Sequence, residues 1–119
     1  MTLRALAALL EGYRFDTSNE DAVQRGLASV LAEQRIVFRR EVPVPGGRLD
    51  FLVDVDGGTA IEVKLDGSTA NLIRQLARYA ELEGVRSLLV VTTRHRLAQV
   101  PREIAGKPVR VALLLGGSF

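Results

Sequence analysis

One aspartate and one Glu-x-Lys triplet are the residues of this chain whose types and spacing could do chemistry. Asp50 lies in segment 46–53, whose composition predicts a β-strand, and the triplet lies in a second predicted strand, residues 60–65. Because alternate residues of a strand point to opposite faces, Glu62 and Lys64 share one face. The sequence therefore predicts a site at which two carboxylates and one ammonium group meet.

The segment between these strands predicts how they pair. Residues 56–58, Asp-Gly-Gly, are typical of a hairpin turn, since Asp and Gly adopt the backbone conformations that tight turns need. With a three-residue loop, Asp50 lies opposite Lys64, and Leu52 lies opposite Glu62. Side chains paired in this way are near enough to share a metal ion and a phosphate.

Two segments of this chain resemble known nuclease motifs. Leu49-Asp50 followed by Glu62-Val63-Lys64 resembles the motif of the PD-(D/E)XK nuclease superfamily, with leucine in place of the proline that often precedes the aspartate. Gln75-Leu76-Ala77-Arg78-Tyr79 is similar to the Gln-x-x-x-Tyr motif of the RecB-like branch. The resemblance covers roughly residues 46–80. It implies the restriction-endonuclease-like fold, an α/β (α+β) fold with an αβββαβ core and a mixed central sheet flanked by helices.

The chemistry that the resemblance implies is hydrolysis of a phosphodiester, which needs an activated water and neutralisation of charge at the phosphate. Asp50 and Glu62 are then the metal ligands, with the backbone carbonyl of Val63 as a third. Lys64 is expected to orient or deprotonate the water and to hold the phosphate. Without a cation two facing carboxylates repel one another. A cross-strand Asp–Lys ion pair on a solvated sheet face is the alternative interpretation.

The composition bounds the size of the protein and the type of metal. The 119 residues suffice for one domain, and the chain contains no internal repeat or linker. It has no cysteine and one histidine, which excludes cysteine-held zinc and disfavours histidine-rich sites. Oxygen ligands remain, and they favour Mg²⁺ or Mn²⁺. The net charge of +2 argues little about partners.

The choice of lysine at position 64 is itself informative. Only Lys64 and Lys107 of the 16 basic residues are lysines, so the chain uses arginine almost wherever a positive charge is needed. A compact ammonium group on a flexible stem can contact a phosphate and an attacking water, whereas a guanidinium prefers bidentate contacts. Lys64 is therefore predicted to be chemically specified rather than a solvated strand lysine.

Apolar periodicity and turn residues predict the other elements. Thr17 and Glu20 fit a capping box at the start of a helix. A strand that begins at Ile36 is expected to lose its pairing at Pro43 and Pro45. The other predicted elements are a helix over 3–12, the end of the capped helix near 32, a helix over 69–83 capped by Gly84, a buried strand over 85–92, a short helical turn over 101–104 and a last strand over 109–115.

Two interpretations of Glu20 are open. Helical periodicity places it on the same side as Leu27 and Leu31, where a carboxylate suggests a metal or water contact. The resemblance points the same way, since family members often place a Glu on this helix near the metal. Alternatively, Glu20 only completes the capping box with Thr17. Gln24 is a weaker candidate for the metal contact.

Gln75 and Tyr79 lie four residues apart on the later helix, at one edge of its apolar arc. An amide and a phenol at that edge can reach over the predicted site to hold substrate or to orient Lys64, the work that the resemblance implies for this motif. A polar helix edge with a half-buried tyrosine is the alternative. Arg74 and Arg78 are expected to point away from this edge.

Arginine side chains supply candidates for nucleic-acid contact, because guanidinium forks suit phosphate oxygens. His95 is expected to be a loop residue rather than a catalytic base. With 5% aromatic residues, no stacking platform for single strands is visible. The candidate phosphate contacts are Arg39, Arg40, Arg48, Arg74, Arg78, Arg94 and Arg96.

The expected function is that of a Mg²⁺- or Mn²⁺-dependent nuclease acting on DNA, and in principle on RNA, with structure-selective or weakly sequence-selective cleavage. One alternative is a dimeric Holliday-junction-resolving endonuclease, whose homodimer interface is the apolar tail from Leu113 to Phe119. Another is a non-catalytic nucleic-acid-binding or interaction module. The N-terminal apolar run stops at Glu11 and is too short to span a bilayer, so we expect a cytoplasmic protein without membrane contact.

Overall fold

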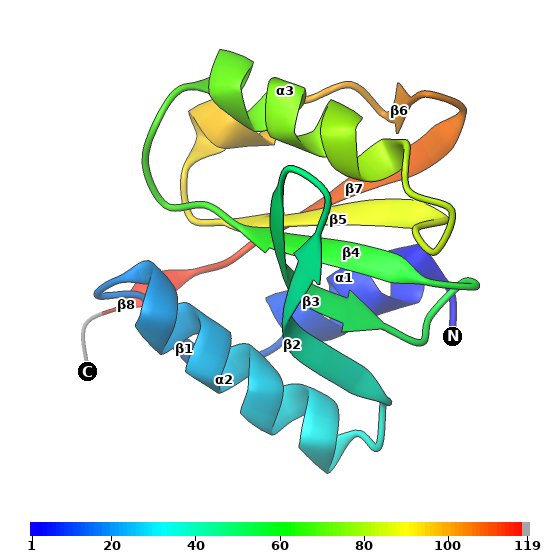
Figure 1. Ribbon diagram of the computed structural model, residues 1–119. Coiled ribbons are helices and arrows are strands. Elements are labelled where there is room, and N and C mark those ends of the chain that lie inside the picture. The colour runs from blue at the N-terminus through cyan, green and yellow to red at the C-terminus, as the bar shows by residue number, and fades with distance from the viewer. Residues whose placement is uncertain (118–119) are drawn as a thin grey trace.

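The computed structural model of the chain describes residues 1–117 and has a mixed α/β architecture (Figure 1). Its helices are α1 (Leu3–Glu11), α2 (Glu20–Glu33), α3 (Thr69–Ala80) and a short 3-10 helix, η1 (His95–Ala98). Its strands are β1 (Phe15–Asp16), β2 (Phe38–Val44), β3 (Gly47–Val53), β4 (Thr59–Val63), β5 (Ser87–Thr92), β6 (Glu103–Ile104), β7 (Lys107–Leu113) and β8 (Gly116–Gly117).

The six-stranded sheet has the order β2-β3-β4-β5-β7-β6. Strands β2, β3 and β4 form an antiparallel meander, whereas β4, β5 and β7 run parallel. Helix α3 makes the crossover between β4 and β5, as parallel neighbours require. The predicted αβββαβ order and mixed sheet flanked by helices are confirmed. The short parallel pair of β1 with β8 was not predicted.

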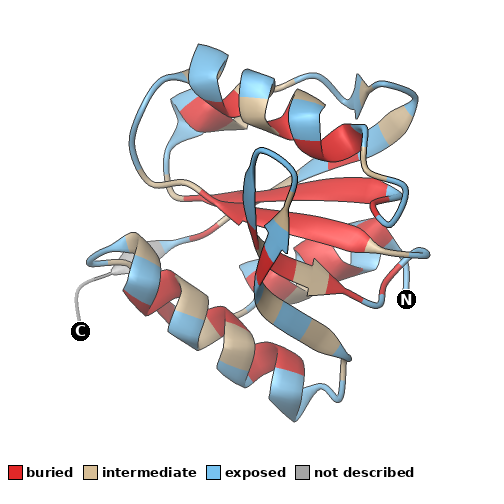
Figure 2. Cartoon of the chain, in the orientation of Figure 1, coloured by how far each residue is buried: buried red, intermediate tan, exposed pale blue. Residues whose placement is uncertain are grey.

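Helices cover both faces of the sheet, and each face has its own apolar core. Helices α1 and α2 pack on one face, where they bury Phe51, Ile61 and Leu89. Helix α3 packs on the other face over Ala60 and Leu88. Figure 2 shows β4 and β5 buried along their length between these layers. The strand predicted over 85–92 to be buried on both faces is confirmed in β5.

Two helix ends differ from the predictions. The N-cap of α2 is Asn19, whose side chain accepts the Ala22 N–H at 2.8 Å. The predicted capping box that pairs Thr17 with Glu20 is therefore wrong, because Glu20 is the first residue of the helix and the residue before it is Asn, a stronger N-cap than Thr. Helix α3 ends at Ala80, three residues before the predicted end, and Glu81 rather than Gly84 follows it.

The β2–β3 hairpin bends sharply, and the bend positions the site. Leu49 belongs to the α3 core and Phe51 to the opposite core, although a flat strand would point both to one face. Glu41, beside the bend on β2, has a φ of 52°. The tip of the hairpin therefore leaves the sheet and crosses toward α3 (Figure 1).

Pairing in this hairpin continues through Pro43, which lies opposite Arg48, up to the Val44–Gly47 pair. The prediction that pairing fails at Pro43 is wrong, because β2 is an edge strand whose outward N–H groups have no ladder partner to lose.

The C-terminal part also differs from the prediction. The short helix is η1, not residues 101–104, and 103–104 form β6 along the edge of β7. The last long strand ends at Leu113, and Leu115 is exposed, while Phe119 of the proposed dimer tail lies outside the described residues. None of the helices in residues 1–117 has the length and apolarity needed to cross a membrane.

Candidate active site

Asp50 lies at the point where β3 separates from β4. The ladder between the two strands runs from Val53–Thr59 to Phe51–Ile61, so its continuation brings Asp50 beside Glu62. The predicted pairing of Asp50 with Lys64 is therefore wrong by two residues. A two-residue shift keeps every side chain on its predicted face, so the grouping of the charges is retained.

The loop of the β3–β4 hairpin explains this shift. The last pair of this hairpin joins Val53 to Thr59, and β3 ends there, while the Asp54 N–H still donates to Val37 on the β2 side at 2.9 Å. The loop is then five residues long, 54–58, and closes through a 3.0 Å hydrogen bond from the Gly58 N–H to the Val55 carbonyl. Positive φ angles of 79° and 126° at Gly57 and Gly58 permit this tight turn.

The Asp50 carboxylate takes the place of the missing strand partner. Its Oδ2 accepts the Val63 N–H at 2.8 Å. Because the N–H and C=O of one strand residue point to the same side, the Val63 carbonyl also faces the Asp50 side of β4. Asp50 and the carbonyl predicted as a metal ligand therefore lie on the same edge of β4.

Glu62 is a buried carboxylate with an incomplete set of partners. The residue is only 5% exposed, and its Oε1 has no hydrogen-bond partner within residues 1–117. Burial and then the negative charge of Asp50 together raise the pKa of Glu62 to about 9, while Lys64 opposes the shift. An isolated carboxylate in this position needs either a proton or a cation.

Lys64 follows β4 directly and is half-buried. Its backbone N–H donates to Val91 at 2.9 Å, which extends the β4–β5 pairing by one residue. Its ammonium group makes no hydrogen bond or ion pair with any residue that the structure describes. The other lysine, Lys107, donates its ammonium group to the Leu82 carbonyl at 2.8 Å. The two lysines of the chain therefore differ in that only Lys64 has an unoccupied head group.

Gly67 provides the space for the Lys64 side chain. Its φ is +93°, and a Cβ at this position would lie 3.2 Å from Cε of Lys64. A side chain here would therefore be strained and would also press on the lysine. This glycine was not predicted to contribute to the site, although an Asp-Gly step between a strand and a helix N-cap is a recognisable signal.

Glu20 reaches the same place from α2. Its Oε2 accepts the Leu65 N–H at 3.1 Å, and its charge adds to those that raise the pKa of Glu62. It therefore ties the start of α2 to the chain just after Lys64. Gln24, one turn later, accepts a 3.1 Å hydrogen bond from Arg40.

Gln75 and Tyr79 connect α3 to the bent hairpin. The Gln75 side-chain amide donates to the Tyr79 hydroxyl at 2.9 Å, and that hydroxyl donates to the Arg48 carbonyl at 2.9 Å. Burial, and then the charge of Glu62, raise the pKa of Tyr79, so the phenol remains a donor. The pair therefore holds the hairpin that carries Asp50 against α3.

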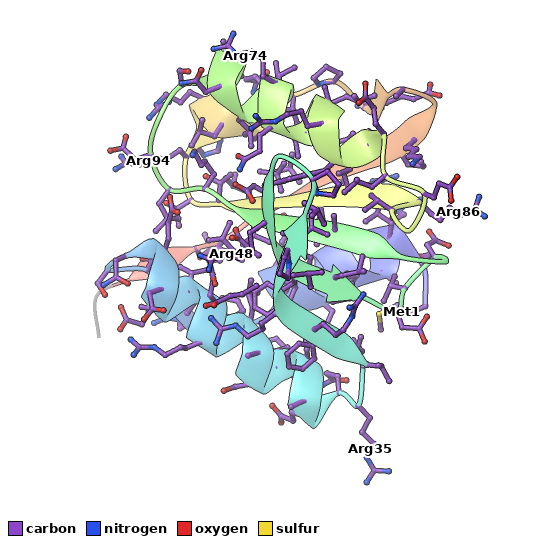
Figure 3. All side chains as sticks on the ribbon, viewed as in Figure 1. Met1, Arg35, Arg48, Arg74, Arg86 and Arg94 are labelled. Atoms are coloured by element: carbon purple, nitrogen blue, oxygen red, sulfur yellow. The ribbon has the colours of Figure 1, made fainter. Side chains whose placement is uncertain are left out.

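The arginines predicted to contact phosphates lie in different parts of the molecule. Figure 3 shows Arg48, Arg74 and Arg94 on the side of the molecule where β4 ends, and Arg35 and Arg86 away from it. Arg74 and Arg78 line one cleft together with Lys64 and Gln75, so the expectation that they point away from Gln75 is wrong.

The other arginines have structural contacts. Arg40 lies over the Phe51 ring, with its Cζ 5.4 Å from the ring centroid, and Arg48 pairs with Glu41 at 3.5 Å. Arg39 lines a separate hollow on the edge of the sheet with Asp54.

Arg94 and Arg96 hold the loop after Lys64, a contact that was not predicted from the sequence. The Arg94 Nε donates to the Leu65 carbonyl at 3.1 Å. Arg96 donates to the Gly67 carbonyl and pairs with Asp66 at 3.3 Å. His95 between them is exposed and begins η1.

The donor set bears on which cation fits. Within residues 1–117 no three His, Asp or Glu side chains group closely enough to hold a metal by themselves. Asp50 and Glu62 offer two carboxylates, and Mg²⁺ commonly binds one or two carboxylates together with waters and substrate phosphates. The unpartnered Oε1 of Glu62 is a buried acceptor that a cation would satisfy. The residues present therefore fit a hard divalent cation that keeps open coordination positions.

Comparison with known proteins does not assign the chain to a family. No protein-family model matches the chain, and no curated protein matches its sequence. The functional interpretation therefore depends on the site itself.

Proposed function

We propose that this protein is a Mg²⁺- or Mn²⁺-dependent nuclease that hydrolyses phosphodiester bonds. The observation that carries the proposal is a buried glutamate, Glu62, with an unpartnered oxygen, next to Asp50 and near the unpaired ammonium group of Lys64. A fold that needed only stability would not bury a carboxylate beside another one. Together the three groups suit a cation and a phosphate.

The residues divide the work by their chemistry. Asp50, Glu62 and the Val63 carbonyl would hold the metal, which when bound supplies positive charge to the phosphate and acidifies water. Lys64 binds a non-bridging phosphate oxygen and steadies the attacking water, because its head group makes no hydrogen bond or ion pair within residues 1–117. Tyr79 and Gln75 keep the hairpin that carries Asp50 in position.

One observation favours a second candidate, a non-catalytic nucleic-acid-binding module. With only two clustered carboxylates, a single proton on Glu62 would also relieve the repulsion. The protein would then bind anions through Lys64 and its arginine neighbours without cleaving them. A dimeric junction-resolving enzyme has no such supporting contact in residues 1–117.

The test is cleavage of labelled single-stranded, duplex, flapped and four-way-junction DNA, and of RNA, in Mn²⁺, Mg²⁺ or EDTA. Asp50→Asn is the inactive control, and its folding is checked by circular dichroism. We expect metal-dependent cutting by the natural protein and none by the variant. Binding without cutting in either metal would support the non-catalytic candidate instead.

A further inference from the structure

A basic cleft lies beside α3 and next to the carboxylate pair. It has a volume of about 550 Å³ and is lined by Lys64, Asn71, Arg74, Gln75 and Arg78. Its five lining residues are three cations and two amides, without an acidic or aromatic side chain. The cleft therefore combines positive charge with hydrogen-bond donors.

None of the three cations of the cleft forms an ion pair with a residue of 1–117. The ion pairs within residues 1–117 join Arg25 to Asp21, Arg48 to Glu41 and Arg96 to Asp66, and none includes a residue of the cleft. Like charges gathered in one concave surface repel one another and attract anions. An anionic ligand is therefore the occupant that this surface favours.

The geometry of the cleft narrows the type of anion. Arg74 and Arg78 are four residues apart on α3, so their stems lie about 6 Å from each other on one side of the helix. Two guanidinium forks in a row, followed by Lys64, suit a series of phosphates better than one compact anion. The positive side chains of the cleft therefore form a row from the middle of α3 to the end of β4.

The amides of the cleft are already engaged within the protein. Asn71 accepts a hydrogen bond from Arg74, and Gln75 donates to Tyr79. These amides are therefore less able to read base edges, and without an aromatic side chain the cleft has no surface on which bases would stack. Recognition here would depend on the backbone of a strand and not on its sequence.

We propose that this cleft binds the sugar-phosphate backbone of a nucleic-acid strand, independently of base sequence, and directs it to Lys64. The link to Lys64 rests on the proposed nuclease function, whereas strand binding by Arg74 and Arg78 does not. The chemistry that the cleft recognises is a row of phosphodiesters, which DNA and RNA share.

The test measures binding of fluorescent mixed-sequence single-stranded DNA and RNA by anisotropy, in EDTA and between 50 and 200 mM salt. The double variant Arg74→Gln/Arg78→Gln is compared with Arg35→Gln/Arg86→Gln, which removes the same charge far from the cleft (Figure 3). All four side chains are exposed, so both variants should fold. We expect the cleft variant to lose at least about tenfold in affinity and about 1.4 units of salt slope, about 0.7 for each lost phosphate contact on a single strand, and the control to change little.

Equal losses of affinity in the two variants would overturn the proposal that the cleft binds the strand, since the protein would then attract nucleic acid through its overall positive charge. Strong dependence on base sequence, or displacement of DNA by polyglutamate at equal charge concentration, would also overturn it. Similar affinity for DNA and RNA is the expected result. If the natural protein binds strands through the cleft but never cuts in Mg²⁺ or Mn²⁺, the nuclease proposal fails and the cleft stands. If the natural protein cuts and the cleft variant retains the natural KM, the proposal of strand binding in the cleft fails and the nuclease proposal is retained.

Discussion

The two ends of β4 each bury a polar side chain, but they treat it differently. At the first end, the Thr59 hydroxyl donates to the Val55 carbonyl at 2.9 Å and lies 2.7 Å from the Ser87 hydroxyl. At the other end, Glu62 is also buried, yet its Oε1 has no partner in the part of the chain that the structure describes. One strand thus contains a hydroxyl group whose hydrogen bonds are made and a carboxyl oxygen whose hydrogen bond is not.

This difference distinguishes a structural polar group from a functional one. Buried polar groups that serve the fold are hydrogen-bonded, and exceptions gather where a ligand or a reaction completes the set. Only the Glu62 end of β4 lies next to a second carboxylate and a lysine whose head group makes no hydrogen bond or ion pair among the described residues. We therefore expect a change at the Glu62 end to reduce activity and raise stability, and a change at the Thr59 end to lower stability and leave activity unchanged.

The largest effect is expected from Glu62→Gln. Cleavage in Mg²⁺ should fall at least about 100-fold, because Glu62 would hold the cation that stabilises the negative charge developing at the phosphate. The same variant should be more stable than the natural protein in EDTA at pH 8, because its folded state no longer has to retain a proton at position 62 that the unfolded chain releases. Single-turnover cleavage and urea unfolding measure the two results. A variant that cuts normally would contradict the role given to Glu62.

Thr59→Val is the counterpart at the other end of the strand. It should lower the free energy of unfolding by about 1–3 kcal/mol, because the Ser87 hydroxyl and the Val55 carbonyl lose their partner. Cleavage per folded molecule should be unchanged. Loss of activity in proportion to that of Glu62→Gln would mean that the two ends of β4 do not differ in role.

The stability of the metal-free protein should depend on pH through Glu62. Its pKa rises from the ordinary 4.5 to about 9 in the folded chain. Below pH 4.5 both states are protonated, whereas between these values the folded state retains a proton that the unfolded state releases. Stability should therefore fall as pH rises through this window, by up to about 1.4 kcal/mol per pH unit, and level off above it.

Urea unfolding from pH 5 to 9 in EDTA measures this slope. Glu62→Gln should flatten it, and saturating Mg²⁺ should do the same in the natural protein, since the cation replaces the proton. Identical slopes for the natural protein and the variant would show that Glu62 is not the titrating group.

The smallest effect is expected from Tyr79→Phe. The variant loses the hydrogen bond to the Arg48 carbonyl, and with it about 1 kcal/mol of stability. Amide exchange in the hairpin 42–49 should become faster, and cleavage should fall less than tenfold. Tyr13→Phe is the matched control, because Tyr13 accepts from Gln34 on an exposed surface. Equal exchange in both variants would remove the hairpin role from Tyr79.

Much of the fold follows from local patterns in the sequence. Alternation places Glu62 and Lys64 on one face of β4, and that grouping survives the corrected register because a shift of two residues preserves faces. The continuous apolar run of β5 marks a central strand. Gln75 and Tyr79 were singled out correctly as a pair on one helix edge, since helical spacing is regular.

The remaining features depend on contacts between distant segments. Asp56 was interpreted as a turn residue, but it also accepts the Leu3 N–H at the start of α1, 53 positions away. The bend between Leu49 and Phe51 has no local signal, so the Tyr79–Arg48 contact could not be foreseen. Strands of two residues, such as β1 and β8, are too short for a pattern to appear.

The most direct test of the carboxylate site is calorimetric titration of Mn²⁺ into the natural protein and into Glu62→Gln, at pH 7.5 without nucleic acid. We predict that the natural protein binds the cation and releases protons on binding, detected as a dependence of the heat on buffer ionisation. The variant should bind far more weakly and release none. Equal binding by both proteins, or no binding by the natural one, would contradict a cation held by Asp50 and Glu62.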